Sequence, residues 1–275
     1  MNQPDAQTEA GAPAYGAPQP QDVPVVQEPA RLGPIQRLGG TLFSPGETFE
    51  DVNRKPTWIV PILIAMVTIL ASTLFFEWRV KPNWDQIMVS ETRKRVEKSG
   101  QSLTEEQIQQ QAAIGATFAK FAPLLAVVFT PIIYLILAGI FALGLMFIQA
   151  KTTFKKVLSV VAWSGAATGI VALLVTVAVL FVRDPAELRN LNPSEFGNIV
   201  PSNIGAFLSS DTAAAIRSVA SSLDVFTLWW LILLSIGFAA IAGSRKITSS
   251  KTGAMVFGFW LVFVVLKVAW AAAFG

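Results

Sequence analysis

The chain has 275 residues, of which 53% are hydrophobic and only 14% are charged, with a formal net charge of +3. An ordinary soluble domain is charged at roughly a quarter of its residues, so this composition argues against a soluble enzyme and favours a membrane protein. Cysteine and histidine are both absent, which excludes disulfides, zinc ribbons, iron–sulfur sites, Ser-His-Asp triads and histidine-bound metals. We therefore expect a protein that is not an enzyme and that uses no cofactor or metal.

Residues 1–30 contain six prolines, four acidic residues and no lysine or arginine, interleaved with glutamine and alanine. Such a segment cannot bury enough apolar surface to offset the entropy lost on ordering. It also lacks the basic start and the apolar core of a secretory signal peptide. We expect a disordered cytoplasmic tail, which either only solubilises the chain or binds a partner.

Two short helices are predicted between the tail and the first apolar run. In residues 34–43 the apolar side chains recur at helical spacing with Arg37 on the opposite side, as in a helix that lies on a membrane surface. The next residues fit the start of a second helix. Ser44 would cap it, Pro45 would occupy its first turn, and Glu47 would complete a capping box.

Five apolar runs are long enough to cross a bilayer as helices of about 20 residues. Two long polar connections and two short basic turns separate them, and the second half of the first connection has the period of an amphipathic helix that leads into the second span. The predicted spans are 57–76, 122–149, 157–182, 225–242 and 254–274. We thus predict an all-α, polytopic membrane protein in which residues 31–275 form a bundle of five transmembrane helices.

Two local features of these spans affect helix packing. Pro131 lies inside the second span, where a proline removes a backbone hydrogen bond and should kink the helix. Gly165 and Gly169 lie four residues apart in the third span and form a small-residue surface that permits close approach of another helix. We expect this surface to pack inside the molecule's own bundle, and a dimer seam is the alternative.

Lys267 is the one charge well inside a predicted span, and an ionisable group at that depth is costly unless it is paired or hydrated. Asp224 lies at the start of the preceding span, and at about 1.5 Å per residue the two depths differ by roughly 6 Å. Three roles are open for Lys267. Its side chain snorkels to the outer surface, pairs with Asp224 to hold two spans together, or takes part in transport.

The distribution of positive charge predicts the orientation. The two short turns, 150–156 and 243–253, together hold six basic residues and no acid, whereas the two long connections hold ten basic and eleven acidic residues. Because basic residues in short loops stay on the cytoplasmic side, the turns and the N-terminus should face the cytoplasm of a bacterium, and the C-terminus should lie outside its plasma (inner) membrane. No basic stretch interleaved with aromatics lies outside the membrane flanks, so we expect no nucleic-acid partner.

Three segments carry a set of family motifs. They are 43–50 (FSPGETFE) with 55–58 (KPTW), 154–164 (FKKVLSVVAWS) and 226–237 (FTLWWLILLSIG). Together they resemble the bacterial branch of the Yip domain family, the Ypt/Rab-interacting membrane proteins, over roughly residues 36–274. The resemblance implies five spans and a cytoplasmic N-terminus. Eukaryotic relatives are associated with small GTPases and vesicle traffic, but the Asp-Leu-Tyr-Gly-Pro stretch that characterises them is not found here, and no catalytic or ligand residue carries over.

Two functional hypotheses of different classes follow, and both have the lipid bilayer as a partner. The first is a non-enzymatic adaptor or membrane organiser whose cytoplasmic face binds a protein or an anionic lipid. That face would consist of the tail, the helix that follows Ser44 and the two basic turns. The alternative is a small transporter or channel subunit, which Pro131, the glycine surface and Lys267 would serve. A bilayer-shaping role is a third hypothesis, and the sequence leaves the partner, transport activity and oligomeric state open.

Overall fold

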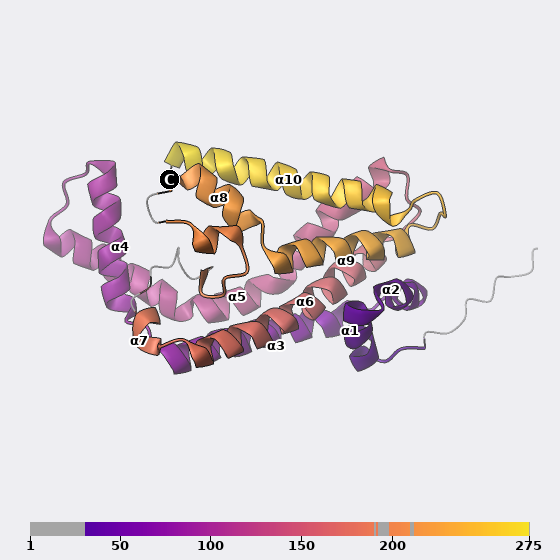
Figure 1. The fold of residues 1–275 in the computed structure, drawn as a ribbon, viewed down its shortest axis with the longest axis horizontal. Helices are drawn as coiled ribbons and strands as arrows, with labels where there is room; N and C mark the ends of the chain where they lie inside the picture. The colour runs from indigo at the N-terminus through magenta and orange to yellow at the C-terminus, as the bar shows by residue number, and fades with distance from the viewer. Residues whose placement is uncertain (1–30, 190, 192–197, 210–211, 275) are drawn as a thin grey trace, which may run out of the picture.

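A computed structural model describes residues 31–189, 191, 198–209 and 212–274, so the predicted tail of residues 1–30 lies outside the described residues. The described part of the chain is helical, and its longer helices run lengthwise side by side (Figure 1). They are α3 (Ile59–Val80), α5 (Glu105–Phe147), α6 (Phe154–Val182), α9 (Val225–Ile241) and α10 (Ser249–Phe274). The predicted all-α class is confirmed.

Four helices of the described residues, α3, α5, α6 and α10, are long and apolar enough to cross a membrane. The remaining apolar helix, α9, has 17 residues and a length of about 25 Å, which is at the short limit for a spanning helix. Large apolar side chains cover the outer surface of the bundle, for example Leu63 and Val67 on α3 and Val262 and Leu266 on α10. The predicted polytopic membrane architecture is confirmed.

α5 is a single helix of 43 residues that joins the predicted amphipathic segment to the second span. Thr104 caps it: the Gln107 amide donates to Thr104 Oγ1, and the Thr104 amide donates to the Gln107 side chain. Pro131 cannot donate to the carbonyl of Val127, yet the helix continues without a break to Phe147. In Figure 1 α5 follows a bent path across the bundle, which a proline inside a helix permits.

α4 (Trp84–Ser99), which the sequence pattern did not single out, pairs with the first part of α5. The two helices form a hairpin that projects at one end of the bundle (Figure 1). Exposed ion pairs join them, Arg93 with Glu105 at 2.7 Å and Lys120 with Asp85 at 3.3 Å. Exposed pairs of this kind contribute little to stability.

α1 (Pro34–Phe43) and α2 (Pro45–Arg54) form a second hairpin at the opposite end (Figure 1). Pro45 occupies the first turn of α2 as predicted, but the predicted side-chain cap by Ser44 is wrong. Ser44 also ends α1, where its amide donates to the Gly40 carbonyl at 2.7 Å, and its side chain makes no capping hydrogen bond to α2. The two helices lie so close that a Cβ on Gly40 would collide with Thr48 Oγ1.

The short connections after α5 and α9 lie at the same end as the α1–α2 hairpin (Figure 1). They contact one another, because the Lys151 amide donates to the Ala242 carbonyl at 2.8 Å. Gly243 has a φ of 68°, and a Cβ there would lie 2.5 Å from the Lys151 carbonyl oxygen, so this position requires glycine. We call this end, formed by α1, α2 and residues 148–156 and 242–251, the platform.

The main hydrophobic core joins the α1–α2 hairpin to the spanning helices. Phe49 of α2 is fully buried, and its ring reaches α9 at Gly237, where a Cβ would lie 3.2 Å from the ring and 2.5 Å from Val160. Asn53 Nδ2 donates to the Ala240 carbonyl of α9 at 3.1 Å. The hairpin is therefore packed into the bundle and is not a loose appendage.

Candidate functional site

The α1–α2 hairpin encloses a buried ion pair. Arg37 and Asp51 are each 3% exposed. Arg37 Nη2 lies 2.8 Å from Asp51 Oδ2, and Arg37 Nε donates to the same oxygen at 2.9 Å, while the Arg31 backbone amide donates to Asp51 Oδ1 at 2.7 Å. The predicted placement of Arg37 on the polar side of a surface helix needs correction, because that side of α1 packs against α2.

Arg37 also connects the hairpin to the first spans. Its Nη1 donates to the Lys55 carbonyl at 3.0 Å and to Thr57 Oγ1 at 2.7 Å. Trp163 of α6 donates from Nε1 to the same Thr57 oxygen at 3.4 Å. One guanidinium thus joins α2, the residues that lead into α3 and, through Thr57, α6.

Burial raises the pKa of the Asp51 carboxyl, but hydrogen bonds from the Arg31 amide and from Arg37, together with the Arg37 charge, outweigh burial and hold the pKa below its ordinary value of 3.8. Because the folded-state pKa is lowered, the carboxylate contributes stability above the unfolded-state pKa and loses it as pH falls through the folded-state value. The attachment of the hairpin is therefore sensitive to acid only below about pH 4.

The outer surface of the platform combines cationic and apolar side chains. Ile35 and Phe43 of α1 are each 86% exposed. Exposed basic residues lie at the end of α2 and on the two turns of the platform, and they are Arg54, Lys55, Lys151, Lys155, Arg245, Lys246 and Lys251. Exposed apolar side chains beside several cations are the chemistry with which proteins attach to anionic lipid surfaces.

Lys267 and Asp224 do not form the predicted ion pair in the structure. Lys267 Nζ instead donates to α8 (Ala214–Ser222), to the Ser218 carbonyl at 3.4 Å and to the Ser221 and Ser222 hydroxyls at 3.0 and 3.1 Å. Asp224 caps α9, accepting from the Thr227 amide at 2.8 Å and from the Ser202 hydroxyl. α8 packs directly on α10, so its serine oxygens lie within hydrogen-bond distance of the Lys267 ammonium. The depths of the two residues in their spans predicted Asp224 as the partner because they contain no information on α8.

Gly165 and Gly169 face other helices of the same chain. A Cβ on Gly165 would collide with the Tyr134 hydroxyl of α5, and a Cβ on Gly169 would lie 3.8 Å from Thr68 of α3. Both glycines also line a hollow of about 310 Å³ between α5, α6 and α9. The small-residue surface of α6 therefore faces helices of its own chain, and part of it borders a hollow.

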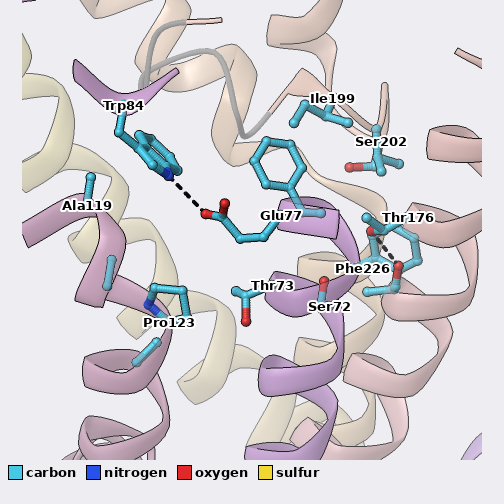
Figure 2. Close-up of a pocket in the computed structure, with 15 residues that line it drawn as sticks. Ser72, Thr73, Glu77, Trp84, Ala119, Pro123, Thr176, Ile199, Ser202 and Phe226 are labelled. Carbon is cyan, nitrogen blue, oxygen red and sulfur yellow. Dashed lines mark hydrogen bonds between the residues drawn. The ribbon is translucent and has the colours of Figure 1, made fainter. Parts of the chain in front are cut away.

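The end opposite the platform contains a larger cavity, of about 500 Å³, between α3, α5, α6, the start of α9 and residues 199–202. Figure 2 shows Glu77 of α3 and Trp84 of α4 pointing toward one another across it, and Trp84 Nε1 donates to Glu77 Oε1 at 3.0 Å. Glu77 is the only ionisable residue among those that line this cavity. The first predicted span ends at Phe76, which leaves Glu77 in the connection that follows, but α3 continues to Val80 and carries the carboxylate in its last turn.

Comparisons with known proteins agree with this architecture. A family model described as the Yip1 domain matches residues 39–271. The chain is 25% identical over 230 residues to a Bacillus subtilis (strain 168) protein named "Membrane protein YknW", and the alignment covers 82% of this chain and 87% of that protein. No solved structure matches the chain significantly.

Replacing Arg37 with methionine should lower the free energy of unfolding by about 3–5 kcal/mol, because removal of one partner leaves the other charge buried and uncompensated. The measurement is the thermal unfolding midpoint of the purified protein in detergent, followed by circular dichroism. The double variant R37M/D51L should recover part of the loss, since no buried charge remains. R93M is the matched control from an exposed pair and should cost less than about 1 kcal/mol; equal losses in R37M and R93M would contradict the assignment.

Acid should reveal the contribution of Asp51. The difference in unfolding midpoint between the wild-type protein and D51N should stay constant from pH 7 to about pH 4 and shrink at lower pH. Below that pH the carboxyl of the unfolded wild-type chain takes up a proton while the folded carboxylate is still charged, so acid favours unfolding. A difference that grows on acidification would show that the pair does not hold the carboxylate in its charged form.

Proposed function

Since the chain belongs to the Yip1 domain family of membrane proteins, we propose that it acts as a non-enzymatic membrane adaptor or organiser through the platform. The observation that carries the proposal is the buried pair of Arg37 and Asp51, which fixes the α1–α2 hairpin on the spans. A docking surface needs side chains held in one orientation by the elements beneath them, and this hairpin meets that condition.

We further infer that the platform lies on the cytoplasmic side of a bacterial plasma membrane. The support is the positive charge of the two short turns, because basic residues in short loops stay on the cytoplasmic side. The hairpin and both turns lie at one end of the bundle (Figure 1), so one orientation places them all in contact with cytoplasmic partners. The C-terminus would then lie outside.

The chemistry of the platform suits two kinds of partner. Its exposed cations, each worth about 1 kcal/mol near an anionic lipid surface, would attach the two turns and the end of α2 to anionic lipid. On α2 the exposed Glu47 and Glu50 lie on the helix whose other face carries the buried Phe49 and Val52. This acidic face would be available to a protein partner while the cations contact lipid.

A small transporter or channel subunit is the second candidate, and the cavity beside Glu77 favours it. Toward the platform, however, fully or almost fully buried side chains fill the bundle, among them Phe141, Leu145 and Phe238. Transport would require this core to open, whereas an adaptor requires it to stay packed. We therefore rank transport second.

A photo-crosslinking amino acid at position 50, on the exposed face of α2, should capture a platform partner in intact cells. The matched control is position 98, exposed on α4 at the opposite end, and mass spectrometry of the adducts separates protein from lipid. The position-50 adduct should become several-fold weaker in the R37M background, because the hairpin loses its fixed orientation. Identical adducts from positions 50 and 98, or none from position 50, would refute the adaptor.

Orientation can be tested directly because the chain has no native cysteine. An impermeant thiol reagent applied to intact cells should label Ser102→Cys, in the exposed turn between α4 and α5, but not Ser249→Cys, at the exposed start of α10. Permeabilised cells should label both. The reverse pattern in intact cells would invert the proposed topology.

A further inference from the structure

The cavity beside Glu77 combines one carboxylate with otherwise neutral walls. Glu77 is half-buried and accepts a hydrogen bond from Trp84 on one oxygen, Oε1. Among the described residues no lysine or arginine forms an ion pair with Glu77. A carboxylate among apolar groups gains stability from a cation that donates hydrogen bonds to it, so the second oxygen is available for a cationic ligand.

The cavity begins at the level of the membrane interface. Residues 59–76 of α3 are uncharged, and Trp78, next to Glu77, is 64% exposed, as expected of a tryptophan at the lipid headgroups. From there the cavity extends toward the middle of the bundle between Ala126 of α5 and Ala172 of α6. A ligand here would place its polar end at the interface and its apolar end at hydrocarbon depth.

The space for an apolar chain continues beyond the cavity. The hollow that contains Gly165 and Gly169 shares Ala172 and Phe226 as walls with the Glu77 cavity. Together the two hollows extend along α6 from Thr176 to Val161, which is about 22 Å at about 1.5 Å per residue. This is an elongated, largely apolar space with a single charge at one end.

We propose that this space binds a free single-chain amphiphile with a protonated amine, the ammonium on Glu77 and the alkyl chain along α6. Charge complementarity selects the amine, because Glu77 is the only ionisable residue among those that line the cavity. A phospholipid headgroup fits less well, because no lysine or arginine lines the cavity to receive its phosphate. The inference is independent of the adaptor function, since the site lies at the other end of the bundle.

The test is native mass spectrometry of the purified full-length protein in a neutral glycol-ether detergent, titrated with dodecylamine at pH 7. One dodecylamine should bind per chain, at least tenfold more tightly than dodecanol, which has the same chain without the charge. E77Q should weaken dodecylamine binding at least tenfold, because the amide still accepts from Trp84 but carries no charge. D85N is the matched control, since Asp85 is next to Trp84 but does not line the cavity. The D85N variant should bind dodecylamine as tightly as the wild type does.

A second variant tests the path of the ligand's alkyl chain and leaves Glu77 unchanged. A172L narrows the junction of the two hollows and should weaken hexadecylamine binding at least threefold more than octylamine binding. Equal binding of dodecylamine and dodecanol, an unchanged affinity in E77Q, or an equal loss in D85N would overturn the amine site. Tighter binding of lysophosphatidylethanolamine than of dodecylamine would overturn the assignment to a free amine.

Discussion

The buried pair of Arg37 and Asp51 is the contact on which the arrangement of the platform depends. Moving two charges out of water costs several kcal/mol for each ion, and only good geometry with further hydrogen bonds offsets that cost. Here the guanidinium also reaches the Lys55 carbonyl and Thr57, and the carboxylate accepts from the Arg31 amide. Such a pair adds little net stability but favours the one orientation of α1, α2 and the first span that satisfies all of these bonds.

The two ends of the bundle differ in how closely their helices approach. At the platform, Gly40, Gly237 and Gly243 remove side chains at the points where neighbouring segments would collide, and large side chains fill the remaining space. At the other end small residues, among them Ala122, Ala126 and Ala172, line a cavity. The close-packed end therefore suits a surface function, and the hollow end suits a ligand.

The proposed partner surface is cationic and exposed to water, whereas the proposed amine site carries a negative charge among apolar side chains. Cations of the platform are exposed and would act across water on an anionic surface, an attraction that salt screens. Glu77 is half-buried among apolar walls, where a single charge selects a ligand more strongly than it would in water. α6 is common to both ends, with Trp163 bonded to Thr57 near the platform and Thr176 in the wall of the cavity.

The sequence by itself determined the helical membrane architecture, because a chain in lipid must satisfy its backbone hydrogen bonds locally and a long uncharged run therefore predicts a spanning helix. It also located the start of α2 at Pro45, since helix starts depend on neighbouring residues. Only the tertiary structure decided where the charged side chains lie and which groups they contact. Arg37 is paired with Asp51, Lys267 donates to the serines of α8, and Glu77 lines a cavity. The partner of a charged side chain is the polar group that the fold brings nearest to it, often from a distant part of the chain. The hydropathy of a sequence contains no information on that distance.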